Sequence, residues 1–105
     1  MIHLVLYTHV SLHEKNAEAR AALVEEIRAQ LRCPLERKIW TVRAVVHGDY
    51  FLPDGRPRKR DSDNVVYTVF NCLAKAGGLD DSYLNRDFSV HVEQAETERV
   101  EITLE

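Results

Sequence analysis

Hydrophobic and polar positions alternate with a period of two in some segments of the chain and recur at helical spacing in others. Residues 2–10 and 39–52 alternate in the way that is typical of β-strands. The second of these segments ends at Pro53-Asp54-Gly55, a turn in which proline fixes φ and glycine allows positive φ. Two more alternating segments predict a C-terminal hairpin that turns over residues 94–98, with apolar positions at Phe88, Val90 and Val92, then Val100, Ile102 and Leu104.

Two further segments carry apolar residues on one side of a helix. The first has Leu23, Ile27 and Leu31 at i, i+4 and i+8; Ser11-Leu12-His13-Glu14 reads as the capping box at its start, and Pro34 closes it. The second predicts a helix over residues 63–76, with Gly77 as its left-handed stop. Its apolar stripe comprises Val66, Val69, Phe70 and Leu73.

Strand, helix, strand, helix and hairpin together predict a small α+β fold. We expect residues 1–105 to form a single domain with a mixed sheet and two helices packed on one face of it. Hydrophobic residues at 45% and charged residues at 30% exclude collagen-like, low-complexity and disordered classes.

Neither targeting nor cysteine usage adds a functional signal. Apolar runs fall far short of the roughly 20 residues that span a bilayer, and no basic leader with a cleavage site is present, so we expect no membrane contact and a cytoplasmic location. Cys33 and Cys72 have no Cys-x-x-Cys spacing, which favours two reduced, buried hydrophobic side chains.

The charge of the chain is unevenly distributed. The net charge is −3, but residues 1–60 hold eleven Lys or Arg against seven Asp or Glu, whereas residues 61–105 hold three against ten. The basic residues are densest just before this boundary, at Arg56, Arg58, Lys59 and Arg60. Such a run is either a solvated loop or a surface that contacts nucleic-acid phosphates.

Acidic residues lie at both ends of the second predicted helix. Asp61 and Asp63 come at its start, and Asp80 and Asp81 follow its end. Carboxylates beside a basic segment suit Mg²⁺, which prefers oxygen ligands and serves phosphodiester hydrolysis. The alternative is that Asp61 or Asp63 caps the helix while Asp80 and Asp81 are loop residues. The spacing alone leaves both interpretations open.

Three features of this region resemble the RusA family of Holliday-junction resolvases. They are Arg58-Lys59-Arg60-Asp61-Ser62-Asp63-Asn64, the helix end Leu73-Ala74-Lys75-Ala76-Gly77, and Leu79-Asp80-Asp81. That family has a basic segment before Asp-x-Asp-Asn at a helix start, and an Asp-Asp pair after a Lys-Ala-Gly type of helix end. The resemblance covers residues 56–105.

The resemblance implies a RusA-like fold and a Mg²⁺-dependent endonuclease that cleaves four-way junctions or other branched DNA during recombination and repair. It implies that Asp61, Asp63 and Asp81 are the catalytic, metal-holding acids, with Asp80 beside them. It further implies a homodimer, because a four-way junction needs paired cuts. The residues expected to contact DNA are Arg56, Arg58, Lys59, Arg60 and Lys75.

One departure from the family pattern opens a second interpretation. The catalytic lysine of the family falls at Tyr67, and a phenol with a pKa near 10 offers no positive charge to the transition state. The alternative is a branched-DNA binding protein that does not cleave. A third possibility is an interaction module in which the acids serve only as caps.

Overall fold

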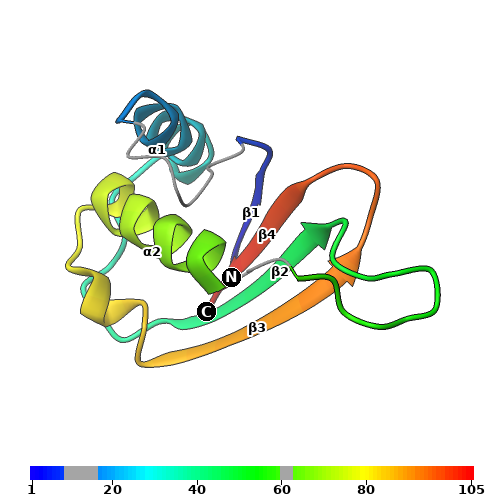
Figure 1. The fold of residues 1–105 in the computed structure, drawn as a ribbon. Coiled ribbons are helices and arrows are strands. Elements are labelled where there is room, and N and C mark those ends of the chain that lie inside the picture. The colour runs from blue at the N-terminus through cyan, green and yellow to red at the C-terminus, as the bar shows by residue number, and fades with distance from the viewer. Residues whose placement is uncertain (9–16, 60–62) are drawn as a thin grey trace.

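The computed structural model describes residues 1–8, 17–59 and 63–105, and of residues 63 and 64 the backbone alone. These residues form, in chain order, β1 (Ile2–Leu6), α1 (Ala17–Leu31), β2 (Thr41–Gly48), α2 (Asp63–Gly77), the short 3₁₀ helix η1 (Asp81–Tyr83), β3 (Asp87–Gln94) and β4 (Arg99–Leu104) (Figure 1). The predicted α+β class is confirmed: the two helices accompany a four-stranded mixed sheet.

The strand order in the sheet is β1-β4-β2-β3. β4 pairs antiparallel with both β1 and β2, whereas β3 runs parallel to β2. The predicted C-terminal hairpin is therefore wrong, because β2 lies between β3 and β4. The alternating pattern identified both strands but carried no information on their partners, and α2 supplies the crossover that makes β3 parallel to β2.

The core lies between the sheet and the two helices, which cover the same face in Figure 1. The centre of the sheet contributes Val42, Ala44 and Val46 from β2, and all three are buried. Leu23, Ile27 and Leu31 of α1 are buried as predicted, and so is the predicted stripe of α2 (Val66, Val69, Phe70 and Leu73). Neither of the described helices is long and apolar enough to cross a membrane.

Element boundaries differ from the expected ones in several places. β1 ends at Leu6, and the expected capping box at Ser11-Leu12-His13-Glu14 lies outside the described residues. β2 ends at Gly48, well short of the expected residue 52.

The left-handed stop of α2 is Gly78, with φ 72°, and the expected stop at Gly77 is wrong. The Leu79 N–H donates to the Ala74 carbonyl at 3.0 Å, the bond that closes a Schellman motif around a left-handed residue. Sequence spacing could not tell which of the two adjacent glycines adopts this conformation.

Candidate functional site

The expected acidic residues lie at opposite ends of α2. Asp63 is the first residue of this helix, and Asp81 begins η1 beyond its last residue, Gly77. A helix of 15 residues at 1.5 Å per residue separates its first and last α-carbons by about 21 Å. The expected convergence of Asp63 and Asp81 therefore does not occur within one chain. Asp61 lies outside the described residues.

Asp80 has a structural role at the start of η1. Its Oδ1 accepts a hydrogen bond from the Ser82 backbone N–H at 2.9 Å, so Asp80 is the N-cap of this short helix. The same backbone hydrogen bond, followed by one from the Ser82 hydroxyl, holds the pKa of the Asp80 carboxyl below its usual value. This geometry agrees with the capping interpretation of Asp80 and keeps its carboxylate charged at neutral pH.

The described side chains do not form a ready-made site for Mg²⁺. Among the described side chains, no three His, Cys, Asp or Glu gather where they could hold a metal ion. With Asp80 engaged as a cap and Asp81 a helix length from Asp63, the described residues offer no oxygen cage for a hard cation. The expected ligands Asp61 and, for its side chain, Asp63 lie outside what the structure describes.

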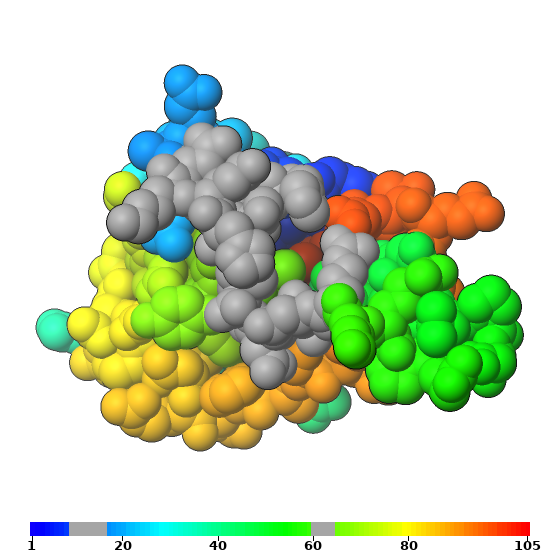
Figure 2. Space-filling view, viewed as in Figure 1, coloured from blue at the N-terminus to red at the C-terminus, as the bar shows by residue number. Residues whose placement is uncertain are grey.

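The basic run belongs to a loop that closes on itself after β2. Phe51 and Pro57 form an isolated antiparallel bridge, and the Arg58 N–H donates to the Tyr50 carbonyl at 2.8 Å. The Gln94 side chain fastens this loop to the end of β3 by accepting from the Phe51 N–H at 2.9 Å. Figure 2 shows the loop, in green, standing out at one end of the molecule. The fold therefore presents the basic run on a protruding, anchored loop.

Two of the expected DNA-contacting arginines already have carboxylate partners. Arg56 Nε lies 2.7 Å from Asp54 Oδ2, and Arg58 Nε lies 3.0 Å from Asp49 Oδ1. These pairs are exposed, and exposed ion pairs contribute about 0–1 kcal/mol, so a phosphate can compete for either arginine. Lys59 is exposed beside them, and Arg60 lies outside the described residues.

Lys75 lies at the other end of α2 from the basic loop. It lines a shallow hollow between α1 and α2 together with Arg20, Asn71 and Cys72. Burial raises the pKa of the Cys72 thiol, and the charges of Arg20 and Lys75 oppose that shift. The structure therefore brings Lys75 beside Arg20, a residue that the sequence did not single out, and away from the basic loop. No local pattern signals this pair, because it depends on how the helices pack.

Tyr67 and two residues of β3, which is the outermost strand in the strand order, line a second hollow. Tyr67, Phe88 and Val90 are 63%, 51% and 38% exposed. Val66 and Phe70 also line this hollow, and the Phe70 and Phe88 rings meet edge to face with centroids 5.4 Å apart. Exposed apolar surfaces of this kind occur at interaction surfaces and in ligand-binding grooves.

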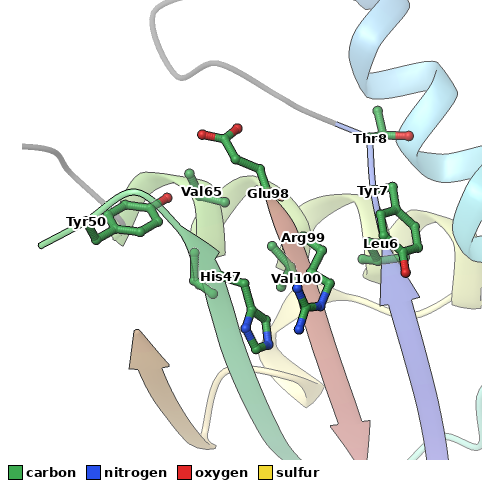
Figure 3. Close-up of a pocket in the computed structure, with 10 residues that line it drawn as sticks. Leu6, Tyr7, Thr8, His47, Tyr50, Val65, Glu98, Arg99 and Val100 are labelled. Carbon is green, nitrogen blue, oxygen red and sulfur yellow. The ribbon is translucent and has the colours of Figure 1, made fainter. Parts of the chain in front are cut away.

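A third feature that the sequence did not predict is a buried histidine near the end of β2. The His47 Nε2 lies 3.2 Å from Glu101 Oε2, and its Nδ1 lies 3.6 Å from Glu93 Oε2. Figure 3 shows His47 beside Arg99, its partner residue on β4. The cavity next to them measures only about 30 Å³, room for water but not for a substrate. This network joins three strands and offers no substrate site.

No protein-family model matches this chain, and no curated protein matches it by sequence.

Proposed function

We propose that this chain acts on branched DNA as a divalent-cation-dependent endonuclease with a fold like that of the RusA family. The observation that carries the proposal is the order of charges around α2: a protruding basic loop leads to the helix, and the Asp80-Asp81 pair follows its far end. The N-terminus of a helix attracts phosphate, because its free N–H groups and its dipole point outward. Arg58 and Lys59 next to such a terminus suit a DNA backbone.

A branched-DNA binding protein that does not cleave is the second candidate. Tyr67 favours it, because an exposed phenol stands where the resemblance expects a lysine. The helix-length separation of Asp63 from Asp81 also favours it, since no three metal-ligating side chains gather among the residues that the structure describes. Cleavage by a set that includes both Asp63 and Asp81 would draw on more than one chain, which agrees with the homodimer that paired cutting of a four-way junction demands.

The two candidates separate in one experiment on a four-way junction labelled on one strand, with a linear duplex of the same sequence as competitor. A native gel in EDTA measures binding, and a denaturing gel after addition of Mg²⁺ measures cleavage. Cut strands support the endonuclease, and binding without cutting supports the second candidate. Equal binding to junction and duplex, or no binding at all, refutes both.

The basic loop is tested by Lys59→Ala, with Arg28→Ala as matched control. Arg28 is an exposed cation on α1 that pairs with Glu25 at 2.8 Å. Loss of one phosphate contact reduces the slope of log affinity against log salt by about 1, so Lys59→Ala should show this change. Arg28→Ala should keep the wild-type slope. Identical slopes for all three proteins would remove the loop from the DNA-contacting surface.

A further inference from the structure

α1 and α2 lie side by side on the same face of the sheet (Figure 1), and the hollow between them has a volume of about 230 Å³. We call it the interhelical hollow. Each helix lines it with residues four positions apart, which places them on one side of that helix. These residues are Ala17 with Ala21 and Arg20 with Val24 on α1, and Asn71 with Lys75 on α2. The hollow is therefore built by the facing sides of two helices.

Small side chains on α1 keep the interhelical hollow open, while its floor is apolar and closed. Ala17 and Ala21 are exposed and leave space that a larger side chain would fill. Val24 and Cys72 lie deeper, and each is only 4% exposed. The Cys72 Sγ lies 3.9 Å from the Arg20 carbonyl oxygen and donates to it, so the two helices are in contact at this level. The result is a concave space with an apolar floor.

Two cations from different helices line this space without a carboxylate partner. Arg20 and Lys75 are both exposed, and neither side chain forms an ion pair or a hydrogen bond with any residue that the structure describes. By contrast, Arg28, Arg56 and Arg58 each pair with a carboxylate. The positive charge at the interhelical hollow is therefore not neutralised by the part of the chain that the structure describes.

The two charges act at the same place. Burial raises the pKa of the Cys72 thiol, and the positive charges of both Arg20 and Lys75 oppose that shift. A concave surface lined by charges of one sign concentrates the field and attracts counter-ions. Asn71 lines the same hollow and is half-buried, and its side-chain amide supplies two further hydrogen-bond donors. The interhelical hollow thus favours an anion that accepts several hydrogen bonds.

We propose that the interhelical hollow binds a small phosphate monoester, with its phosphate between Arg20 and Lys75 and its organic group on the floor at Val24 and Cys72. A phosphate monoester carries a charge between −1.5 and −2 at neutral pH, which two cations match. Its three terminal oxygens accept from the guanidinium fork, the ammonium group and the Asn71 amide. The volume of about 230 Å³ lies below the roughly 300–1,000 Å³ of most ligand pockets, which limits the ligand to about the size of a mononucleotide.

Other anions match the interhelical hollow less well. A monocarboxylate has one charge and leaves one cation without a partner. A phosphodiester inside a DNA backbone also has one charge, and both of its ester oxygens continue into the chain. A dicarboxylate has two charges, but they lie at opposite ends of the molecule, so that Arg20 and Lys75 cannot share one group. A free mononucleotide and the terminal phosphate of a DNA strand share the chemistry that does match.

An NMR titration of the full chain, labelled with ¹⁵N, tests the proposal in a buffer without phosphate or metal. Thymidine 5′-monophosphate should shift the amide signals of residues 17–24 and 71–75 in a saturable way. We expect a dissociation constant of about 0.1–1 mM, because a few charge-assisted hydrogen bonds at an open site give weak binding. Thymidine should cause no such shifts, and succinate should bind at least about tenfold more weakly. No saturable shift with the monophosphate, or equal binding of succinate, would overturn the proposal.

The two sources of the phosphate separate in a second titration. A strand of four deoxythymidines is added with and without a 5′-phosphate. Binding that requires the 5′-phosphate supports the proposal and extends it to DNA ends. No binding of either strand, beside binding of the monophosphate, supports a site for free mononucleotides. Equal binding of both strands at these residues would overturn the preference for a monoester.

The roles of the two cations are tested by Arg20→Gln and Lys75→Gln. Each variant removes a charge-assisted hydrogen bond and should weaken binding of the monophosphate at least about tenfold. Arg28→Gln is the matched control, because it removes one positive charge from the same helix at a residue that pairs with Glu25 at 2.8 Å. It should leave the dissociation constant unchanged. Equal weakening by all three variants would show that net charge controls binding, and the proposal would fail.

The role of the interhelical hollow itself is tested by Ala21→Leu, which fills the space and keeps both cations. This variant should weaken binding at least about tenfold, since the organic group loses its place on the apolar floor. Ala22→Leu is the matched control, because Ala22 is exposed on the same helix and does not line the hollow. Circular dichroism checks that both variants fold. Wild-type affinity in Ala21→Leu would place the ligand outside the hollow and overturn the proposal.

This inference does not rest on the proposed function. The variants are compared with a mononucleotide in the absence of metal and of branched DNA. Binding of the monophosphate by a chain that neither binds nor cuts a four-way junction would refute the proposed function and leave this inference standing.

Discussion

Replacing Gln30 with alanine removes the side chain that occupies the edge of β1. Two hydrogen bonds to Val5 are lost, one in which Gln30 accepts at 3.0 Å and one in which it donates at 2.9 Å. A typical hydrogen bond contributes about 0.5–1.5 kcal/mol net, and both bonds lie at the surface, where water replaces the lost partner. The higher helix propensity of alanine offsets a few tenths of a kcal/mol. We therefore expect Gln30→Ala to lower the free energy of unfolding by about 1–2 kcal/mol.

Urea denaturation followed by circular dichroism measures this change. With a slope of about 1–3 kcal/mol per molar urea, the midpoint should fall by roughly 0.5–1 M at constant slope. Arg28→Ala is the matched control on the same helix, since its exposed ion pair with Glu25 contributes only about 0.2–0.5 kcal/mol. If Gln30→Ala destabilises no more than Arg28→Ala, the two hydrogen bonds from Gln30 do not stabilise the β1 edge.

Two further predictions concern the segment after α2. The lowered pKa of the Asp80 carboxyl means that its contribution to stability is present above the unfolded-state value near pH 4 and is lost as the pH falls through the folded value. Asp80→Asn should therefore reduce the loss of melting temperature as the pH falls below about 4, measured in thermal melts over a range of pH. An unchanged dependence of melting temperature on pH would exclude a stabilising role for the Asp80 carboxylate. Gly78→Ala should lower the free energy of unfolding by about 1 kcal/mol in urea denaturation, because alanine is strained at a φ of 72° although open space surrounds the site. Gly77→Ala should lower it more, because the added β-carbon would come within 2.6 Å of a Leu35 methyl group. A larger effect at Gly78 than at Gly77 would contradict the assignment of the left-handed position to Gly78.

The elements of this fold could be predicted from sequence wherever one face of an element is buried. Burial imposes a period on the apolar residues, so Val66 and Leu73 of α2 and Ile102 of β4 lie in the core as expected. Strand partners could not be predicted in this way. β3 and β4 both alternate, but their placement on either side of β2 follows from the crossover through α2 and from competition for the centre of the sheet.

The candidate site shows a similar division. The motifs correctly placed Asp63 at the start of α2 and Asp81 beyond its end, but the two acids do not converge as the resemblance implies. The rise of a helix fixes the separation of its ends, so the length of the predicted helix already implies that these two residues lie far apart. By contrast, the pairing of Arg58 with Asp49 and the enclosure of His47 depend on loop closure and strand register, and no local pattern encodes them.

Mixing two inactive variants tests most directly whether the acids of two copies act together. We expect Asp63→Asn and Asp81→Asn each to fold and to bind the four-way junction, but not to cut it. In a mixture, about half of the dimers contain one chain of each variant. Each of these dimers has one site with both Asp63 and Asp81 intact and one site in which both are replaced. The mixture should therefore nick the labelled strand at about a quarter of the wild-type rate. A mixture as inactive as either variant alone, beside an active wild-type protein, would contradict a site shared between two copies.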